Sequence, residues 1–569
     1  MNDYLLRYQE WLEKSAGWVR EDLESLKFLP SRDFEEQLRE RFGLLADFGT
    51  GGIRQIVRAG TNGLNDPWVI RVSLGLSRMV KSAIIAYDTR HRSRYFALLA
   101  ARTLAAQGVR VLVFDEPAPT PVLSFAIRRL KTQSGLVITA SHNEPAYNGI
   151  KVYDNRGVQM VPSRIETLKT HLESFGFFER VPEAYAYDFL GEEIKTEYLK
   201  EVSRENAPFD LPDGRRHLIL YTPLHGTGGA YIPPLLDRFG FDCRVVEKQS
   251  RADPTFSTVR YPNPEDPEAF GLALTQAKGM HPMPEMILAT DPDADRIGVY
   301  LLENDSYRPL SGNEIGLLLT DFLVRATPTH PERTEDRTRV LLKTIVTSDS
   351  VKPYALKNRI EVIETLTGFK FLGDRIEAIN GENKEFLAAY EESYGFLHGD
   401  HARDKDALST ALLLGLLLRN LGSASRMIDR LQEIYREFGF YRDSAETQRF
   451  EGSEGARRIE EFMSALRAAD PHRLFSLPVE AVRDYNVEVD PLWRADVFLV
   501  RFNQGMKAIF RPSGTETKLK IYLSAVGKTQ EECEGRYHTL KTEITRAASG
   551  MLASLTTADP SLKDQQNRE

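Results

Sequence analysis

Residues 135–145 read GLVITASHNEP, a short apolar run followed by a polar turn. The run 135–138 has the length of a buried strand, and the Asn-Glu-Pro sequence after it is typical of a turn. Ser141 therefore stands where a strand can deliver a nucleophile to the edge of a sheet. Serine and asparagine beside proline are also ordinary turn formers, so this stretch alone leaves a plain surface turn equally open.

The neighbouring sequence repeats the alternation of strand and helix. Short apolar runs at 83–86, 109–114 and 135–138 are separated by segments of helical length at 95–107 and 121–131. Such alternation predicts an α/β sheet that presents its ligand loops at strand ends. The same pattern recurs at three later apolar runs: 217–221, 286–289 and 340–346.

A chain of 569 residues is too long for one ordinary core, and a prior of roughly 150 residues per domain suggests three to four domains. The last third changes character, with a predicted helix at 426–438 followed by short strands. A smaller α+β domain therefore closes the chain. The predicted boundaries are an N-terminal helical extension at 1–46, three successive α/β domains at 47–205, 206–311 and 312–430, the α+β domain at 431–550 and a flexible tail at 551–569.

Composition limits the classes of partner. A formal net charge of -8 gives no global attraction to nucleic acid or anionic lipid. Two cysteines, Cys243 and Cys533, are too few for a disulfide framework and indicate a reducing compartment. The first residues lack the apolar core of a signal peptide, and the apolar stretch 411–418 is far shorter than a membrane span of about 20 residues. The sequence predicts a cytoplasmic protein with no nucleic-acid or membrane partner.

The N-terminal extension has apolar residues at approximately helical spacing among many charges, which predicts helices that pack on the rest of the chain. A dimer interface in this segment remains an alternative, so the sequence leaves a monomer and a homodimer open.

Residues 291–296 read DPDADR between two apolar runs. Asp291, Asp293 and Asp295 stand at alternate positions, so in an extended loop they can point to one side and offer hard oxygen ligands to Mg²⁺. An EF-hand does not fit, because Arg296 occupies its glycine position and Leu302 its bidentate glutamate position. A solvated acidic turn is the plain alternative.

Residues 511–517 read RPSGTET between two predicted strands. Arg511 offers forked charged donors, and the hydroxyls of Ser513 and Thr515 with the backbone near Gly514 can surround the remaining oxygens of a phosphate. A hairpin turn is the alternative.

Residues 391–395 read EESYG, and 400–406 read DHARDKD. Glu391 and Ser393 could form hydrogen bonds with vicinal hydroxyls, while Lys405 could move a proton if its pKa is lowered. A charged surface loop would look similar.

In this order the segments resemble those of the α-D-phosphohexomutase superfamily, whose phosphoglucomutases and phosphomannomutases share a serine loop, a metal loop, a sugar loop and a phosphate loop. The resemblance spans residues 42 to 525. Glu144 separates Asn143 from Pro145, which is more similar to the branch that holds phosphoglucomutase 2 and phosphopentomutase. Further segments that resemble this branch are FGTGGIR at 48–54, GTN at 60–62 and LTGFK at 366–370.

The resemblance implies a heart-shaped molecule of four domains around a central cleft, three with mixed α/β sheets and one α+β. Ser141 would carry a phosphoryl group and, with Asp291, Asp293 and Asp295, would bind Mg²⁺. Lys405 is the favoured proton-transfer residue, with Lys151 and Lys343 as alternatives. The implied substrate-binding positions are Arg54, His142, Lys343, Thr367, Gly368, Phe369, Glu391, Ser393, Arg403, Arg511, Ser513, Gly514 and Thr515, with Arg296 as a support of the metal loop.

Two of these positions carry further expectations. In an extended segment the side chain of His142 would point away from Ser141, so a hydrolase-like pair is not expected. Phe369 could belong to the core instead of the site.

The implied activity is a mutase that interconverts sugar 1-phosphates and 6-phosphates of glucose, and of mannose as a further substrate, through a phosphoserine and a sugar bisphosphate. Mg²⁺ and glucose 1,6-bisphosphate as primer are the implied cofactors, and small sugar phosphates the partners. A phosphopentomutase and a glucose 1,6-bisphosphate synthase remain open, since all three would use Ser141. From other classes, an aspartyl phosphatase and a sugar-phosphate sensor are the alternatives.

Overall fold

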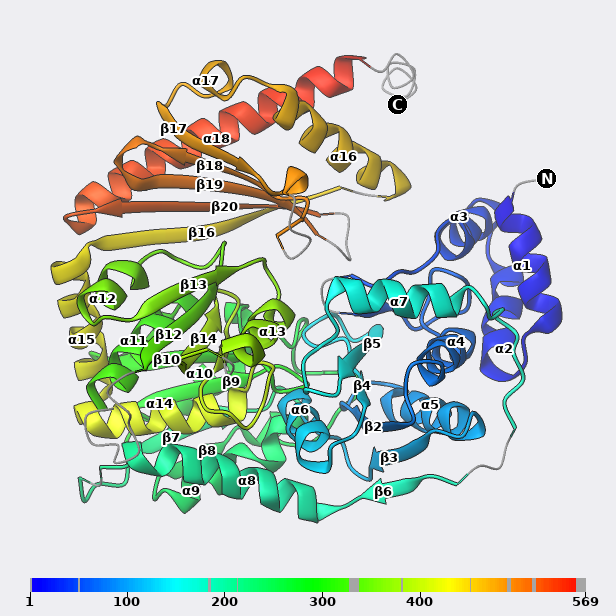
Figure 1. Cartoon of the computed structure of the whole chain (residues 1–569), viewed down its shortest axis with the longest axis horizontal. Coiled ribbons are helices and arrows are strands. Elements are labelled where there is room, and N and C mark those ends of the chain that lie inside the picture. The colour runs from blue at the N-terminus through cyan, green and yellow to red at the C-terminus, as the bar shows by residue number, and fades with distance from the viewer. Residues whose placement is uncertain are drawn as a thin grey trace. The chain divides into compact units, whose positions relative to one another are not determined.

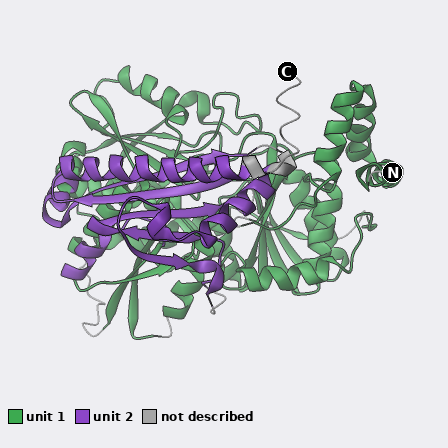
Figure 2. Cartoon of the chain, turned by 90° about the horizontal axis from the view of Figure 1, so that it is seen from above, with its two compact units in different colours: residues 1–344, 358–430 green, residues 345–357, 431–569 purple. Residues whose placement is uncertain are grey.

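The computed structural model describes residues 3–49, 52–182, 186–211, 213–326, 337–379, 382–450, 452–488, 493–513 and 518–558. These residues form four β-sheets with their helices (Figure 1). The chain divides into two compact units, Met1–Thr344 with Asn358–Arg430 and Ile345–Lys357 with Leu431–Glu569 (Figure 2). The predicted fold class, three mixed α/β domains followed by an α+β domain, is confirmed.

The N-terminal extension consists of three helices: α1 (Asp3–Lys14), α2 (Gly17–Ser25) and α3 (Ser31–Phe42). Their apolar faces form one core around Trp11, Leu23 and Phe42. The rings of Phe177 and Phe178 from the first α/β domain lie 5.2 and 5.4 Å from the ring of Trp11. The extension therefore packs on its own chain.

The first sheet has the strand order β1-β5-β4-β2-β3-β6, in which β4, β2, β3 and β6 are parallel and β1 and β5 antiparallel to their neighbours. Every residue of the central strands β2 and β4 is buried, as expected for parallel strands with helices on both faces. Because β2 and β4 are parallel neighbours, the segments after Tyr87 and Ile138 meet at one sheet edge. The elements of this domain are β1 (Ile53–Ile56), α4 (Asp66–Ser77), β2 (Ser82–Tyr87), α5 (Ser93–Ala106), β3 (Arg110–Phe114), α6 (Thr120–Leu130), β4 (Ser134–Ile138), β5 (Tyr147–Asp154), α7 (Pro162–Leu172), β6 (Asp188–Leu190) and α8 (Glu192–Asn206).

The second sheet has the order β11-β10-β9-β7-β8. Its strands β9, β7 and β8 are parallel, whereas β10 and β11 continue as an antiparallel meander. The acidic segment predicted to bind metal is the turn between β9 and β10. The elements are β7 (Leu218–Thr222), α9 (Ile232–Arg238), β8 (Asp242–Val245), α10 (Gly271–Lys278), β9 (Met286–Thr290), β10 (Ile297–Glu303) and β11 (Ser306–Leu310).

The third sheet has the order β13-β12-β14-β15, with only β15 antiparallel. The helix α12 between β12 and β13 belongs to the same compact unit as the C-terminal domain, so this unit is built from two separate pieces of chain. The elements are α11 (Gly312–Ala326), β12 (Thr338–Thr344), α12 (Val351–Lys357), β13 (Glu361–Thr365), α13 (Phe369–Ile379), β14 (Lys384–Glu391), β15 (Gly395–Leu397), α14 (Ala407–Leu421) and α15 (Ala424–Phe438).

The fourth sheet is fully antiparallel, with the order β16-β20-β19-β18-β17. Its last helix, α18, continues to Ala558, so the flexible tail predicted from residue 551 does not begin there. Met551, Leu552 and Leu555 pack against the core of this sheet and extend the helix. Residues 559–569 lie outside the described part of the chain. The elements are β16 (Phe440–Arg449), α16 (Gly452–Ala468), α17 (Pro471–Leu474), β17 (Val479–Asp484), β18 (Phe498–Phe502), β19 (Met506–Pro512), β20 (Lys518–Gly527) and α18 (Gln530–Ala558).

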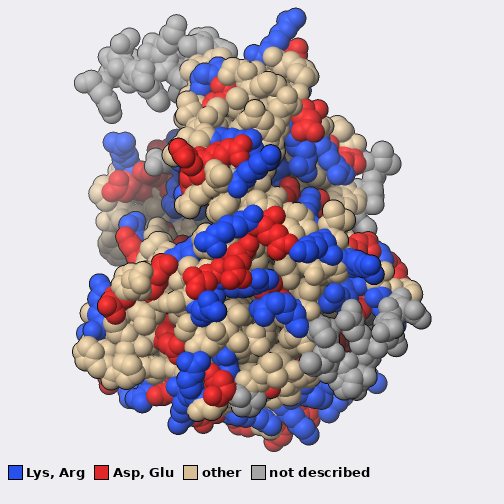
Figure 3. Space-filling model, turned by 90° about the vertical axis from the view of Figure 1, so that its left-hand side faces the viewer, with Lys and Arg blue, Asp and Glu red and all other residues tan. Residues whose placement is uncertain are grey.

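Within the described ranges, no single helix is long and apolar enough to cross a membrane; α14 and α15 pass such a test only as a pair, bent by 89°. On the face shown in Figure 3, Lys and Arg side chains are interspersed with Asp and Glu side chains.

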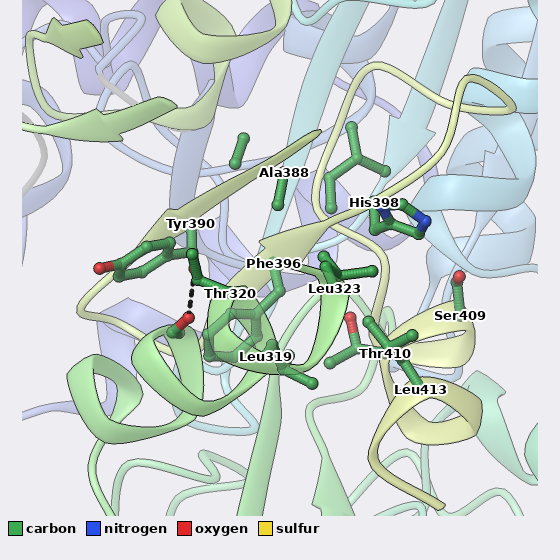
Figure 4. Close-up of a pocket in the computed structure, with 13 residues that line it drawn as sticks. Leu319, Thr320, Leu323, Ala388, Tyr390, Phe396, His398, Ser409, Thr410 and Leu413 are labelled. Carbon is green, nitrogen blue, oxygen red and sulfur yellow. Dashed lines mark hydrogen bonds between the residues drawn. The ribbon is translucent and has the colours of Figure 1, made fainter. Parts of the chain in front are cut away.

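A small, mostly apolar cavity lies inside the third domain (Figure 4). Its walls come from α11, β14, β15 and α14, and no predicted site residue lines it. Thr320, one of its few polar groups, donates a hydrogen bond to the carbonyl of Gly316 at 2.7 Å. The predicted chemistry must therefore be sought at the strand ends.

Candidate active site

The serine loop is the connection of the hairpin formed by β4 and β5. Ser141 is 1% exposed and has a φ of +53°, in the left-handed region that is costly for a residue with a Cβ atom. Its hydroxyl donates a 2.6 Å hydrogen bond to Oδ2 of Asp291, which belongs to the second domain. Two of the predicted segments, 150 residues apart in sequence, therefore meet at one pair of side chains.

The expectation for His142 was wrong. Its Nδ1 lies 3.3 Å from Oγ of Ser141, because the left-handed backbone at Ser141 interrupts the alternation expected of an extended segment.

The acidic segment is a tight turn and not the extended loop expected from the sequence. Oδ1 of Asp291 accepts the backbone N–H groups of Asp295 and Arg296, each at 3.1 Å. The turn nevertheless brings one oxygen each of Asp291, Asp293 and Asp295 within 4.8 Å of one another, and all three residues are buried. The predicted convergence of the three carboxylates is thus observed, although by a different backbone geometry.

These carboxylates have the donor set that a hard divalent cation prefers. Among the described residues, Oδ1 of Asp293 and Oδ1 of Asp295 are buried and have no hydrogen-bond partner. Burial, with the neighbouring carboxylates, raises the pKa of Asp291 well above its ordinary value. Buried acceptor oxygens that face like charges at this spacing fit a Mg²⁺ site.

Two of the three lysines considered for proton transfer lie against the acidic turn. Nζ of Lys151 is 2.6 Å from Asp293 and 2.9 Å from Asp295, and Nζ of Lys405 is 3.2 Å from Asp295. Burial alone would lower the pKa of Lys151, but the two aspartates outweigh it and raise the pKa. Proximity therefore does not separate Lys151 from Lys405.

Lys343, the third lysine, does not join this cluster in the described contacts. Its side chain is buried on β12, where Nζ lies 2.8 Å from Oε1 of Glu364 on the neighbouring strand β13.

Glu391 ends β14 and is 5% exposed. Burial raises its pKa to about 7, in part against the opposing effect of Lys405. Its Oε1 accepts the backbone N–H of Gly368 at 3.0 Å, so the predicted sugar loop and the 366–370 segment meet. Ser393 follows in the turn to β15 and is half-exposed.

Fewer side chains of the segment 366–370 are available to bind a substrate than the sequence predicted. Phe369 is 3% exposed and belongs to the core of the third domain, with its ring 5.6 Å from Nζ of Lys405. Gly368 has a φ of +118°, which favours glycine. Thr367 is half-buried and its hydroxyl has no hydrogen-bond partner within the described ranges.

Arg403, predicted to contact substrate, is instead enclosed in protein. Its guanidinium pairs with Glu377 and Asp400 and donates to the carbonyls of Asp400 and Ala402 at 2.9 and 2.8 Å. With 1% of its side chain exposed, it braces the segment that carries Lys405.

The two other arginines of this unit that were predicted as site residues, Arg54 and Arg296, lie at the site. Nη1 of Arg54, on β1, is 3.3 Å from Oδ1 of Asn143 in the serine loop. Arg296 pairs with Glu265, and its Nε is 3.9 Å from Asp295, which fits a support of the metal loop.

Arg511 and Ser513 belong to the other compact unit. Arg511 lies opposite Lys520 in the β19–β20 pair, and the N–H of Ser513 donates to the carbonyl of Lys518 at 2.8 Å. Gly514 and Thr515 lie outside the described residues.

Sequence reasoning missed three residues that bind the two loops. Thr120 donates a 2.7 Å hydrogen bond to Oδ2 of Asp293, while Asp88 and Arg90 contact the serine loop. The sequence offers one indication for Asp88 and Arg90: they follow directly after the predicted strand 83–86, where a sheet presents its ligand loops.

The arrangement is suited to transfer of an anionic group. A buried hydroxyl contacts one carboxylate of a potential cation site, and amines and guanidinium groups surround the acidic turn. Such a site can position an oxygen nucleophile while it neutralises charge on the transferred group.

Family models match most of the chain. Domains I, II and III of phosphoglucomutase/phosphomannomutase, each described as alpha/beta/alpha, match residues 46–177, 196–303 and 311–437.

Relatives and solved structures agree with these matches. A phosphoglucomutase of Staphylococcus haemolyticus is 38% identical over 511 residues, which cover 84% of this chain and 90% of that protein. A phosphoglucomutase of Staphylococcus aureus is 33% identical over 537 residues, covering 89% and 94%. The structure of a phosphoglucomutase/phosphomannomutase family protein from Burkholderia thailandensis has the same fold, with a TM-score of 0.66 at 18% identity over 89% of this chain and 97% of that one.

Proposed function

The chain belongs to the phosphoglucomutase/phosphomannomutase family of the α-D-phosphohexomutase superfamily and is a sugar-phosphate mutase; on that premise we propose that it interconverts glucose 1-phosphate and glucose 6-phosphate. Mannose phosphates are proposed as further substrates. The preference for glucose is supported by the two staphylococcal relatives, which are phosphoglucomutases.

One observation carries the proposal: Oγ of Ser141 lies 2.6 Å from Asp291, within a buried group of three carboxylates. A serine in this position is placed to exchange a phosphoryl group while the adjacent cluster binds a divalent cation. Asp291, Asp293, Asp295 and an oxygen on Ser141 would hold Mg²⁺. When bound, Mg²⁺ would neutralise charge on the phosphoryl oxygens.

The reaction we propose has two transfers. Phosphoserine 141 gives its phosphoryl group to the free hydroxyl of a sugar monophosphate: the bond from phosphorus to Oγ breaks, and one to the sugar oxygen forms. The hydroxyl proton passes to a base. The bound bisphosphate then reorients within the site and returns its other phosphoryl group to Ser141. By the same step, glucose 1,6-bisphosphate would phosphorylate an enzyme that lacks the phosphoryl group on Ser141.

Lys405 is our candidate for the proton transfer, with Lys151 as the alternative. Lys405 lies next to Asp404, Asp295 and the ring of Phe369, so it joins the acidic turn to the sugar loop. Burial alone would lower the pKa of Lys405, but Asp295 and Asp404 outweigh it and raise the pKa, which is the opposite of the lowered pKa that the sequence-based assignment required. A protonated Lys405 suits the step in which a proton is returned to the leaving oxygen.

The substrate-binding residues would divide between sugar and phosphate. We propose that Glu391 and Ser393 accept and donate hydrogen bonds to sugar hydroxyls, and that Arg511 and Ser513 bind the phosphate that is not transferred. Arg511→Ala would then raise KM strongly, because forked charged donors to a dianion are lost.

The test is the isomerisation of glucose 1-phosphate, mannose 1-phosphate and ribose 1-phosphate, each with Mg²⁺ and a trace of the matching bisphosphate. We expect the highest kcat/KM with glucose 1-phosphate. Dominant turnover of ribose 1-phosphate would instead identify a phosphopentomutase, and no turnover of any of them would favour a bisphosphate synthase.

Replacement of the serine separates the mutase from an aspartyl phosphatase. Ser141→Ala should abolish turnover while the protein remains folded, since the proposed phosphoryl carrier is lost. An active Ser141→Ala protein would refute the mechanism, because only a nucleophile other than Ser141 could then carry the reaction.

A further inference from the structure

A buried ion pair lies behind the serine loop, at the carboxyl end of β2. Nε of Arg90 is 3.3 Å from Oδ2 of Asp88, and both side chains are fully buried. The guanidinium also lies 5.0 Å from the ring centroid of Phe256, a buried residue of the second domain. No step of the proposed mechanism uses this pair.

The Arg90 guanidinium binds four carbonyl oxygens of one loop. Nη2 donates to the carbonyls of Ser141 and Asn143 at 2.6 and 2.5 Å, and Nη1 donates to those of Glu144 and Tyr147 at 2.8 and 3.0 Å. One rigid, permanently charged group therefore holds three carbonyl oxygens of the turn between β4 and β5 and that of Tyr147, the first residue of β5.

Asp88 fixes the same loop through a second path. Its Oδ2 accepts the hydroxyl of Thr139 at 2.6 Å, and the Thr139 oxygen in turn accepts the backbone N–H of Ser141 at 2.8 Å. Its Oδ1 accepts the hydroxyl of Ser93 and the backbone N–H of Arg90. Both the N–H and the C=O of Ser141 are thus tied to the Asp88–Arg90 pair.

The residue held at both its N–H and its C=O is Ser141, whose backbone conformation is energetically unfavourable. A left-handed conformation costs a residue with a Cβ atom about 1–2 kcal/mol, so the φ of +53° at Ser141 needs support from its surroundings. The backbone conformation in turn sets the direction of the Ser141 side chain, whose Oγ reaches Asp291.

We propose that Arg90 is a positioning residue that holds the serine loop so that Oγ of Ser141 stays directed at the acidic turn. The proposal rests on the proposed function, because it assigns Arg90 to the transfer that Ser141 performs. An error of about 1 Å in the placement of a reacting atom can cost about 100-fold in rate, so loss of the clamp should act on turnover more than on substrate binding.

A buried arginine can also be merely structural, and the same chain offers a matched control. Arg419 has 5% of its side chain exposed, pairs with Asp210, donates to the carbonyl of Phe239 and lies 4.1 Å from the ring of Phe241. It shares the burial, carboxylate, carbonyl and ring contacts of Arg90, but none of its described contacts involves the serine loop.

The experiment compares Arg90→Met, Arg90→Lys and Arg419→Met. It measures kcat and KM for glucose 1-phosphate, incorporation of labelled phosphate from glucose 1,6-bisphosphate into Ser141, and the folded fraction. We expect kcat and the labelling rate of Arg90→Met to fall roughly 100-fold, with KM changed less than threefold. Arg90→Lys should recover only part of the rate, because an ammonium group has no forked geometry to bind four carbonyls.

A second variant, Thr139→Val, keeps the proposal testable if Arg90→Met does not fold. Thr139→Val removes the link from Asp88 to the N–H of Ser141 and leaves Arg90 unchanged, and we expect about tenfold slower labelling by the loss of one positioning contact. The proposal is overturned if the labelling rate per folded molecule is at the wild-type level in Thr139→Val and Arg90→Lys, or if Arg419→Met slows labelling as much as Arg90→Met does. A wild-type protein that takes up no label would instead refute the proposed function itself.

Discussion

Two groups of charged side chains lie in the same compact unit, both buried apart from Asp400, and differ in whether all their carboxylate oxygens have hydrogen-bond partners. In the acidic turn, three carboxylates converge, and Oδ1 of Asp293 and of Asp295 have no hydrogen-bond partner among the described residues. In the segment 400–406, each charged side chain contacts a group of opposite charge or a hydrogen-bond donor. These contacts join Asp400 to Arg128, His401 to Glu205, Arg403 to Glu377, Asp404 to Tyr153, Lys405 to Asp295 and Asp406 to Tyr198.

The difference separates a ligand site from a scaffold. Buried acceptors without donors are costly unless something binds them, whereas a closed network of ion pairs and hydrogen bonds stabilises the fold by itself. We therefore expect changes in the acidic turn to remove activity and spare stability, and changes in the 400–406 segment, apart from Lys405, to do the reverse.

The largest expected effect is on activity, from Asp291→Asn. Loss of one carboxylate should reduce mutase activity at least about 1000-fold, because a positioned metal charge supplies several kcal/mol to the transition state. The free energy of unfolding in the presence of a chelator should stay the same or rise, since the change relieves repulsion from Asp293 and Asp295. Urea denaturation and a coupled mutase assay measure both quantities.

A loss of several kcal/mol of stability in metal-free Asp291→Asn would contradict the distinction between the acidic turn and the 400–406 segment. The acidic turn would then be a structural element like the 400–406 segment, and its carboxylates would not be reserved for a ligand.

The next largest effect is on stability, from Arg403→Met. Removal of one partner from a buried ion pair typically costs about 3–5 kcal/mol, and Glu377 and Asp400 would lose their contacts with Arg403. Because Glu377 is partly exposed and also pairs with Arg128, we expect the lower end of that range. The kcat of the folded fraction should change less than about tenfold if Arg403 does not touch substrate.

The opposite result would restore the original sequence-based assignment. An Arg403→Met protein of unchanged stability with a strongly raised KM would mean that the guanidinium binds substrate and not Glu377.

The smallest effect is the change in stability per pH unit. Burial alone would lower the pKa of His401, but Glu205 and Asp406 outweigh it and raise the pKa to about 10. A group whose pKa is raised by folding stabilises the protein below its unfolded pKa of 6.5 and loses that contribution as the pH rises toward 10. The wild-type unfolding free energy should therefore fall between pH 7 and 9.5 more steeply than that of His401→Gln, by up to about 1.4 kcal/mol per pH unit.

The measurement is a series of urea titrations of both proteins across that range. The groups that face His401 are Glu205 on α8, Asp406 at the start of α14 and Tyr198 on α8, all in the closed network. If the unfolding free energies of the two proteins change with pH at the same rate, His401 is neutral in the folded protein and does not form ion pairs with Glu205 and Asp406.

The sequence predicted the site best where spacing alone brings groups together. The acidic turn and the serine loop each follow an apolar strand, which predicted both at strand ends, although β4 and β9 belong to different sheets. The convergence of the three aspartates was predicted from their alternate spacing, even though the backbone of the acidic turn was expected to be extended. Their role and that of Ser141 stay predictions.

Prediction was weaker where it depended on a side chain's partners. Arg403 and Lys405 stand two residues apart in one charged segment, yet one is enclosed by Glu377 and the other reaches Asp295. Residue type and spacing do not distinguish these cases, because Glu377 is 26 residues from Arg403 and Asp295 belongs to another domain. His142 was misjudged for a local reason, since no pattern reported the left-handed φ of Ser141.

Arg90 has no sequence signature of the kind that marks a group in contact with substrate. A residue that binds the carbonyls of a loop leaves no motif of its own in a single chain.

The helix α12 has a consequence for how the protein can be made. Its buried residues Val351, Tyr354 and Ala355 belong to a unit that is completed only by the segment after Leu431, where Phe438 packs against Tyr354. At roughly 5–20 residues per second, a ribosome releases α12 several seconds before that segment exists. During this interval the buried side chains of α12 lack the contacts of that segment, so their packing has to follow the synthesis of the residues after Leu431.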